Sequence, residues 1–477
     1  MVGDQSGDCI YCDNGYALPD RCARRLRRIK MEKILVAGAG ISGQNAAKLL
    51  LAIDEEVVLY DGDASKDKEA LRALFEKEDR IEIVLGELPA EILREVRECV
   101  VSPGIPMDAP VVDTVISKGI EVISEIELAY QVDKGRVAAI TGTNGKTTTT
   151  ALLGQIMKNE FRDVFVVGNI GRAYTSEAGN TNHDSVTVAE VSSFQLETVK
   201  DFRPHVSAIL NITPDHLNRH RTMERYCAAK LHVAMNQKKD DFCILNARDE
   251  WLQEYAPHCP ARVLWFDSER ELEEGAFCRD DIIWLRLDGI DEAVINIHDM
   301  QILGKHNVEN AMAAILMAVA MGVSLDNVRK GLREFQAVEH RIERVVEKNG
   351  VIWYNDSKGT NPDAAIQAIK AMERPTVLLG GGYDKGGSFD EWIESCTGKV
   401  KHLILMGATA EKIRETALRY GITDITMVDS LEEAVNVAAD VSVPGDAVLL
   451  SPACASWGMF PNYEVRGRLF KELVKAL

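Results

Sequence analysis

At 477 residues, the chain is longer than one hydrophobic core usually supports, so two or three domains are expected. Its formal net charge of −19 argues against nucleic acid and anionic membranes as partners, so that any phosphate site must be a local basic island. No apolar run reaches the roughly 20 residues of a membrane helix, and ten cysteines without framework spacing suit a reduced compartment. We therefore expect a cytoplasmic protein with no membrane insertion.

Residues 1–30 differ in composition from the rest of the chain. They are rich in Gly and Asp and end in a basic run over residues 21–30. Cys9, Cys12 and Cys22 raise the alternative of a zinc site, but a CxxC pair with one further cysteine lacks a fourth ligand. We predict a disordered extension, or a start upstream of the true one at Met31.

From residue 33 an apolar strand runs into a GxGxxG turn that begins at Gly38, and a helix and a second strand ending at Asp61 follow. An acidic residue about 20 positions beyond the glycines completes the dinucleotide fingerprint, so a nicotinamide dehydrogenase is one interpretation. The same backbone geometry would hold a nucleotide-sugar diphosphate through Gly38, Gly40, Ser42 and Asp61. The turn alone does not choose between the two.

Two further apolar runs, at residues 100–106 and 120–124, are predicted strands that end in small-residue loops. In doubly wound sheets, ligands bind at such carboxyl ends. A domain boundary near residue 125 is expected, with a helix over residues 125–133 leading into a second α/β domain.

The second domain opens with a strand over residues 137–140, a turn from Gly142 to Gly145, and a helix over residues 147–157. Backbone N–H groups at such a turn attract phosphate, helped by the helix dipole. Lys146 would reach the β- and γ-phosphates, and Thr147 would offer its hydroxyl to Mg²⁺. The pattern is a shortened phosphate loop, because Ile140 stands where the first glycine is usual. An ordinary glycine turn and a switch or transport ATPase are the alternatives.

Polar residues follow three later apolar strands of this domain. Asn169 lies between two glycines, Glu190 follows the second strand, and Asp215 and His216 follow the third. A carboxylate at a strand end suits Mg²⁺, which prefers hard oxygen ligands. Three such strand ends behind one phosphate loop predict a single nucleotide–metal site.

The last part of the chain alternates apolar runs with helical stretches. The predicted strands cover residues 351–354, 376–379, 402–406, 425–428 and 447–450, and helices are predicted over residues 410–420 and 430–439. This alternation predicts a mostly parallel sheet with helices on both faces, in a third domain that starts near residue 338.

The ordered motifs GTNGKTTT, GNIG, EVSSFQLE, NITPDHLNRH and YCAAK, followed by GKHNVEN, EHRIE, NDSKGTN, LGGGYDK and LSPACAS, resemble the Mur ligase family. The resemblance covers residues 31–477 and is closest to the member that adds D-glutamate. It implies three domains: a Rossmann-like UDP-binding unit over residues 31–124, a central P-loop ATPase-type unit over residues 125–337, and a Rossmann-like unit over residues 338–477. The last would bind the amino acid and part of ATP.

The implied activity is an ATP-dependent amide ligation of D-glutamate to UDP-N-acetylmuramoyl-L-alanine through an acyl phosphate, with Mg²⁺. We also expect a monomer. Because the ATP loop lies on the second domain and the amino-acid contacts on the third, we predict closure of the third domain before chemistry. Tyr463 stands where the family usually has phenylalanine.

The resemblance assigns roles residue by residue. Catalytic roles fall on Lys146, Glu190, His216 and Lys230, and Mg²⁺ ligation on Thr147, Glu190, His216 and Lys230, the last as a CO₂-derived carbamate. ATP contacts fall on Gly142, Thr143, Asn144, Gly145, Lys146, Thr147, Thr148, Asn307, Asn310, Arg341 and Asp356. Substrate contacts fall on Ser42, Asp61, Ser102, Asn169, Lys358, Thr360, Lys385, Ser456 and Tyr463.

For several of these residues, taken singly, a purely structural role is the alternative. Asn310 precedes an apolar helix and could be a helix cap, Lys230 could be a solvated lysine, and His340 with Arg341 could form a surface patch. Cys454 is interpreted as structural. Relatives that add L-alanine, a diamino acid or a dipeptide are the nearest alternatives. The Asp-Asn-Pro-Arg run of the diamino-acid enzyme is absent from the sequence, and residues 451–456 favour glutamate.

Overall fold

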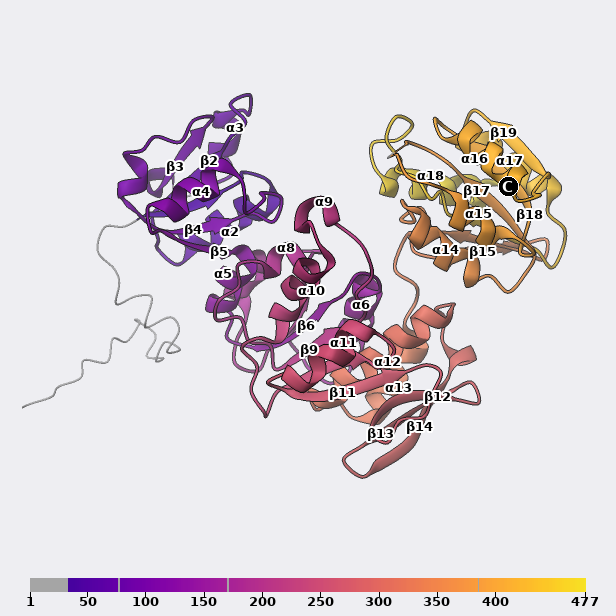
Figure 1. The fold of residues 1–477 in the computed structure, drawn as a ribbon, viewed down its shortest axis with the longest axis horizontal. Coiled ribbons are helices and arrows are strands. Elements are labelled where there is room, and N and C mark those ends of the chain that lie inside the picture. Colours follow the sequence, from indigo (N-terminus) through magenta and orange to yellow (C-terminus); the bar gives the residue numbers. More distant parts are fainter. Residues whose placement is uncertain (1–32, 76–77, 170, 385) are drawn as a thin grey trace, which may run out of the picture.

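The computed structural model of the protein describes residues 33–75, 78–169, 171–384 and 386–477. The extension over residues 1–30, with Cys9, Cys12 and Cys22, and the predicted substrate residue Lys385 lie outside these ranges. The described chain forms three lobes, each built on its own sheet, of five, nine and six strands (Figure 1). The three-domain α/β architecture predicted from the sequence is confirmed. Among the helices of the described residues, none combines the length and the apolar character needed to cross a membrane.

The first lobe is an all-parallel sheet in the order β3-β2-β1-β4-β5, which is the doubly wound order expected for a Rossmann-like unit. Because β1 lies in the middle, the glycine turn that follows it opens at the switch point of the sheet. The elements of this lobe are β1 (Lys33–Ala37), α2 (Ile41–Ala52), β2 (Val57–Asp61), α3 (Lys68–Arg72), β3 (Ile81–Leu85), β4 (Val96–Val101), α4 (Pro110–Ser117) and β5 (Glu121–Ser124), with 3₁₀ turns η1 (Glu78–Arg80) and η2 (Ile92–Arg94).

The second lobe has the sheet order β14-β13-β12-β11-β10-β9-β6-β8-β7, parallel from β7 to β12 and antiparallel from β12 to β14. The antiparallel end was not predicted from the sequence. Its strands are β6 (Arg136–Thr141), β7 (Val164–Gly168), β8 (Val186–Glu190), β9 (Val206–Ile209), β10 (Phe242–Asn246), β11 (Arg262–Asp267), β12 (Gly275–Arg279), β13 (Ile282–Leu287) and β14 (Ile290–Asn296).

Helices cover both faces of this sheet. They are α5 (Glu125–Val132), α6 (Lys146–Lys158), α7 (Tyr174–Glu177), α8 (Ser193–Leu196), α9 (Leu217–His220), α10 (Met223–Leu231), α11 (Glu250–Tyr255), α12 (Lys305–Ala320) and α13 (Leu325–Glu334), with 3₁₀ turns η3 (Ala178–Asn180), η4 (His232–Ala234), η5 (Ala256–His258) and η6 (Ile297–Asp299). Helix α12 is apolar on all sides from Ala311 to Ala318, and these residues are buried against α6 and the neighbouring strands.

The third lobe has the order β15-β16-β20-β17-β18-β19, parallel except for the edge strand β15. Its elements are β15 (Glu343–Lys348), β16 (Val351–Asn355), α14 (Pro362–Lys370), β17 (Thr376–Gly380), α15 (Asp390–Cys396), β18 (Val400–Met406), α16 (Ala410–Arg419), β19 (Ile425–Val428), α17 (Leu431–Val441), β20 (Ala447–Leu450) and α18 (Tyr463–Ala476). The five predicted strands are all present, and β15 is an addition to them.

The first two lobes share one hydrophobic core. Leu49 of α2 and Tyr174 of α7 belong to the same buried cluster as Ile126 of α5. Arg219, beyond β9, donates to the carbonyl oxygens of Pro103 (2.7 Å) and Ile105 (3.1 Å) in the first lobe. The boundary at residue 124 stays a prediction, since the core continues across it.

A buried carboxylate also fastens α5 to the second lobe. Glu127 is fully buried, and its oxygens accept hydrogen bonds from the backbone N–H groups of Lys200 (2.9 Å), Asp201 (3.1 Å) and Phe202 (2.9 Å). These donors lie between α8 and β9, outside any helix or strand, so the carboxylate takes the place of the water that they would otherwise bind.

Glu127→Ala is expected to lower the thermal unfolding midpoint by roughly 6–12 °C, because it leaves the buried N–H of Phe202 and the partly buried N–H groups of Lys200 and Asp201 unpaired, at a cost of about 3 kcal/mol. Calorimetry of the variant beside Glu254→Ala, which removes an exposed carboxylate on α11, measures the difference. Equal midpoints for the two variants would contradict this role of Glu127.

Candidate functional site

The phosphate loop lies at the carboxyl end of β6, where the chain turns into α6. Gly142 and Gly145 have φ angles of 142° and 87°, in the region that favours glycine. A Cβ on Gly142 would lie 3.1 Å from the Cβ of Leu210, and one on Gly145 would collide with the side-chain oxygen of Asn310. At both positions, the backbone conformation favours glycine and the neighbouring side chains leave little room for a Cβ atom.

Two lysines donate to one carbonyl oxygen of this loop. Lys146 Nζ lies 2.9 Å from the carbonyl oxygens of Gly142 and Thr143, and Lys230 Nζ lies 2.7 Å from that of Gly142. Burial lowers the pKa of Lys146, although Glu190 opposes the shift. Burial and the nearby Lys146 ammonium lower the pKa of Lys230 well below its ordinary value. The interpretation of Lys230 as a solvated lysine is wrong, because its side chain is 2% exposed.

Glu190 faces this basic pair from the end of β8. It is 1% exposed, its Oε1 accepts a hydrogen bond from Asn169 Nδ2 at 3.0 Å, and its Oε2 has no hydrogen-bond partner among the described residues. A buried carboxylate oxygen without a partner is costly unless a cation or donor is supplied. Glu190 therefore fits a hard cation such as Mg²⁺, and Asn169 orients it.

His216 directly precedes α9 with φ 53°, and its side chain is half exposed. Burial and the positive charges of Lys146 and Lys230 lower its pKa, which favours the neutral imidazole that can bind a metal ion. In the described ranges, the one group of three His, Cys, Asp or Glu side chains with ligand atoms within 4.8 Å of one another is Glu339, His340 and Glu343. The structure thus does not gather Glu190 and His216 into such a group.

A cavity of about 220 Å³ lies beside the phosphate loop, between the second and third lobes. Six of the predicted ATP-binding residues line it: Asn144, Gly145, Thr148, Asn310, Arg341 and Asp356. Gly142, Thr143, Lys146, Thr147 and Asn307 are not part of its lining. Asn307 accepts a hydrogen bond from Asn310 at 3.0 Å and donates to the Leu303 carbonyl at 2.7 Å, so that it holds Asn310 in place.

The cavity also contains Asn211, which follows the same predicted strand as Asp215 and His216. Its lining further includes residues that the sequence did not single out as ligands: Thr213, Phe266, His306, Glu309 and Gln367. Burial, together with Arg341, lowers the pKa of His306 to about 4, so its ring is neutral at pH 7. His306 stands inside the GKHNVEN motif, and its position next to Asn307 was the signal available. Phe266 and Gln367 come from apolar or helical stretches that carry no such signal.

The simpler interpretations of Asn310 as a helix cap and of His340 as part of a surface patch are wrong. Asn310 lies in the second turn of α12, with its Oδ1 accepting a hydrogen bond from Thr149 at 3.2 Å, so it is not a helix cap. His340 is 2% exposed and cannot belong to a surface patch. Its neighbour Arg341 turns to the cavity, where burial raises the pKa of Asp356 to about 7.

The predicted substrate residues fall in two places. In the first lobe, Asp61 accepts hydrogen bonds from Ala39 N (2.8 Å) and Lys66 Nζ (2.6 Å), and Ser102 Oγ donates to the Gly38 carbonyl (3.3 Å). Ser42 lies in the first turn of α2, beside the same glycine turn.

In the third lobe, the Lys358 ammonium lies 5.7 Å from the ring centre of Tyr463, the first residue of α18. Burial lowers the pKa of Lys358 and raises that of Tyr463 to about 12, so the phenol stays protonated. The Thr360 backbone N–H donates to the Lys358 carbonyl (2.8 Å), and Ser456 is buried in the loop after β20. Cys454, two residues earlier, is buried and contacts Thr409, in keeping with a structural role.

Three family models match the chain. They are described as Mur ligase MurD-like, N-terminal domain (residues 32–124), Mur ligase middle domain (residues 140–318) and Mur ligase, glutamate ligase domain (residues 340–454). Two curated relatives carry the name UDP-N-acetylmuramoylalanine--D-glutamate ligase. The protein from Lachnospira eligens is 51% identical, covering 94% of this chain and 100% of its own. That from Lachnoclostridium phytofermentans is 52% identical, covering 94% and 98%.

Solved structures share the fold. UDP-N-acetylmuramate-alanine ligase from Thermotoga maritima aligns with a TM-score of 0.58 at 18% identity, covering 93% of this chain and 99% of its own. MurF from Acinetobacter baumannii aligns with a TM-score of 0.57 at 17% identity, covering 94% of each.

Gly145→Ala is expected to weaken nucleotide binding about tenfold or more, because the new methyl group displaces Asn310 and strains a left-handed residue by about 1–3 kcal/mol. Calorimetric titration with a non-hydrolysable ATP analogue and Mg²⁺ measures this loss. Gly104→Ala is the matched control, since no atom lies within 4 Å of its added Cβ. Unchanged affinity in Gly145→Ala would remove the loop from the nucleotide site.

Proposed function

The chain belongs to the Mur ligase family, and on that premise we propose that it joins D-glutamate to UDP-N-acetylmuramoyl-L-alanine at the expense of ATP. The observation that carries the proposal is that Lys146, Lys230 and Glu190 meet beside one phosphate loop, where Glu190 Oε2 has no hydrogen-bond partner among the described residues. Relatives about half identical over 94% of the chain support the choice of D-glutamate over other amino acids.

The chemistry begins with a carboxylate, which is a poor electrophile. A carboxylate oxygen of the alanyl group attacks the γ-phosphorus of ATP, the bond to the bridging oxygen breaks, and ADP leaves with an acyl phosphate formed. Lys146 and the backbone N–H groups at the start of α6 neutralise charge on the transferring phosphoryl group. The amine of D-glutamate then attacks the carbonyl carbon, inorganic phosphate leaves, and a proton is released. We propose that Lys358, Thr360, Lys385, Ser456 and Tyr463 hold this amino acid.

The UDP end of the substrate is assigned to the first lobe. Its glycine turn, with Ser42, Asp61 and Ser102, offers backbone and hydroxyl donors at the switch point of a parallel sheet. With the family established, this turn needs no nicotinamide cofactor, and the dehydrogenase interpretation is set aside. Asn169 is proposed to lie between the muramoyl-alanine part and Glu190.

A divalent cation is proposed to be held by Thr147, Glu190 and His216. Mg²⁺ would supply charge neutralisation at the phosphate oxygens when bound. The remaining ligand is proposed to be a carbamate formed when the neutral Lys230 amine adds CO₂ and loses a proton. The lowered pKa of Lys230 supports this, because only the neutral amine reacts. It would turn a buried cation into an anionic oxygen ligand.

We further propose a monomer whose third lobe closes on the second before chemistry. The cavity at the phosphate loop is lined from both lobes, with Arg341, Asp356 and Gln367 on one side and Asn144 and Asn310 on the other. Closure would exclude water from the acyl phosphate.

The proposed reaction is tested by phosphate release with UDP-N-acetylmuramoyl-L-alanine, ATP and a panel of amino acids of both hands. We expect D-glutamate to exceed L-glutamate, L-alanine and a diamino acid by about 10²-fold or more in kcat/KM, because a site built to pair polar groups rejects analogues that leave them unpaired. Equal rates across the panel would refute the assignment of D-glutamate, and release without any amino acid would favour a simple ATPase.

Replacing Lys230 tests the carbamate. Lys230→Ala is expected to lose about 10²-fold or more in turnover and to recover part of it in acetate, whose carboxylate fills the vacated space. Lys230→Arg should not recover, because a guanidinium stays protonated. In ¹³C-bicarbonate, a carbamate carbonyl signal should appear in the NMR spectrum of the unmutated chain and vanish in both variants.

Potassium chloride at the same ionic strength serves as the control for acetate. Full turnover of Lys230→Arg, or a carbamate signal that survives the substitution, would leave Lys230 an ordinary phosphate contact.

A further inference from the structure

The segment between α13 and β15 contains two residues in the left-handed region. His340 has φ 67° and Ile342 has φ 44°, and Arg341 lies between them. This conformation is uncommon for non-glycine residues and rare for a β-branched side chain, with a cost of about 1–3 kcal/mol at each position. Such a backbone persists only where surrounding groups fix it.

Each peptide group around Arg341 is fixed by a residue of the third lobe. The His340 N–H donates to Glu343 Oε2 (3.0 Å), the His340 carbonyl accepts from Lys358 N (3.0 Å), and the Ile342 N–H donates to Asp356 Oδ1 (3.2 Å). Within the segment, the Arg341 N–H donates to the Val338 carbonyl at 3.0 Å, and the three bonds to the third lobe add to this one local bond.

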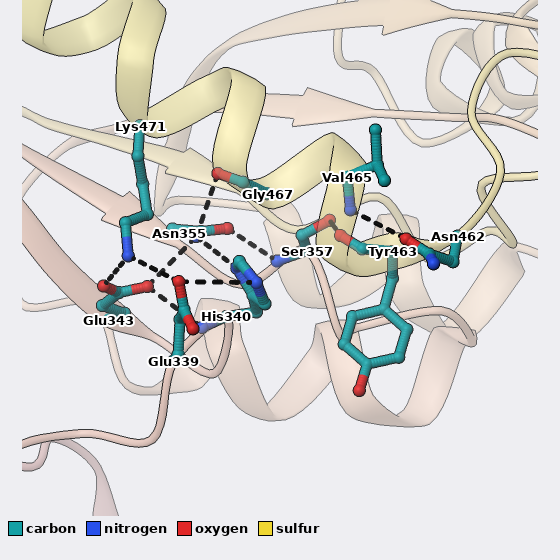
Figure 2. A network of polar contacts seen from close by, with 10 residues as sticks. All are labelled: Glu339, His340, Glu343, Asn355, Ser357, Asn462, Tyr463, Val465, Gly467 and Lys471. Atoms are coloured by element: carbon teal, nitrogen blue, oxygen red, sulfur yellow. Dashed lines mark hydrogen bonds and ion pairs between the residues drawn. The ribbon is translucent and has the colours of Figure 1, made fainter.

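The His340 ring locks the same segment against α18. Asn355 Nδ2 donates to its Nδ1 at 2.9 Å, and a Cβ on Gly467 would collide with the ring, so the imidazole packs on bare helix backbone (Figure 2). Asn355 also donates to Glu343 Oε2 at 3.1 Å. The ring, the amide and the carboxylate thus form one network, in which His340 and Asn355 are buried and Glu343 is partly buried.

Lys471 closes this network from the middle of α18. Its ammonium lies 2.6 Å from Glu343 Oε1 and 2.9 Å from Glu339 Oε1 (Figure 2). Burial alone would lower the pKa of Lys471, but hydrogen bonds to Glu343 and Glu339 raise it, and Lys471 in turn lowers the pKa of Glu339. Glu339, His340 and Glu343 could also coordinate a metal ion, but Lys471 already supplies the positive charge that the two carboxylates require.

Arg341 carries the effect of this network to the nucleotide site. Its side chain lines the cavity, and its Nε is buried with no hydrogen-bond partner within the described part of the chain. Its charge lowers the pKa of Lys146 and of His306. The guanidinium therefore lies near both the phosphate loop and the His306 ring. A phosphate or ribose oxygen of a bound nucleotide would satisfy this Nε donor.

We propose that Lys471 and Glu343 are positioning residues for nucleotide binding. Lys471 neutralises Glu343, Glu343 holds the left-handed turn at His340, and the turn aims Arg341 at the nucleotide. Since α18 begins at Tyr463, the same helix connects the proposed amino-acid site with the nucleotide site. The inference rests on the proposed function, because it takes ATP as the occupant of the cavity.

The test measures the dissociation constant of ADP with Mg²⁺ by calorimetry, in a cycle of Lys471→Met, Arg341→Ala and the double variant. We expect Lys471→Met alone and Arg341→Ala alone to weaken binding by about tenfold or more, and Lys471→Met to add less than about twofold in the Arg341→Ala background. Lys471→Arg should restore most of the affinity, because a guanidinium can bond to both carboxylates. Lys475→Met removes the same charge from an exposed position one turn later and should bind ADP normally.

Three outcomes would overturn the inference. The first is normal ADP affinity in Lys471→Met, and the second is normal ADP affinity in Arg341→Ala. The third is that Lys471→Met weakens ADP binding by the same factor in the unmutated chain and in Arg341→Ala. A lowered melting temperature with unchanged ADP affinity would assign Lys471 to stability alone. Failure of the unmutated chain to bind ADP or ATP would instead refute the proposed function, so the two failures are distinguishable.

Discussion

The site depends on the register of β6 between its two parallel neighbours. Ile140 pairs with Glu190 of β8, and Thr141 pairs with Ile209 of β9, so that the phosphate loop, the carboxylate and residue 211 emerge at one sheet edge. Asn211 holds the loop in place. Its carbonyl oxygen accepts a hydrogen bond from Thr143 N (2.9 Å), its Oδ1 accepts one from Asn144 N (2.8 Å), and its Nδ2 donates to the Asn144 carbonyl (3.1 Å). A slip of one residue in this register would turn every side chain to the other face.

Several positively charged side chains lie together near the phosphate loop, although the protein as a whole is acidic. Burial lowers the pKa values of Lys146, Lys230 and Lys358, and a neighbouring positive charge, from Lys146 or Arg341, lowers each of them further, in a chain of net charge −19. Buried like charges are unfavourable until an anion arrives, and Glu190 offsets only part of this repulsion. The polyphosphate of a nucleotide relieves that repulsion, which makes binding energy available at the place where the phosphoryl group is transferred.

Much of this could be predicted from the sequence because parallel α/β folds place polar residues directly after apolar strands. The phosphate loop, Glu190 and the strands of the third lobe follow from that rule. The edge strand β15 was missed because a half-exposed antiparallel strand has no long apolar run, and β15 is only partly buried along its length. The meander β12–β14 was missed as well, although β13 contains a short apolar run at residues 282–285. His340 was misjudged because charged neighbours surround it in sequence, while the group that buries it, α18, comes more than a hundred residues later.

The central claim is that the alanyl carboxylate itself accepts the γ-phosphoryl group of ATP. The most direct measurement follows ¹⁸O placed in both oxygens of that carboxylate during a turnover with D-glutamate. The account predicts that one labelled oxygen appears in each inorganic phosphate released and that the other remains in the new amide. Phosphate free of ¹⁸O, formed at the same rate as the amide, would contradict it.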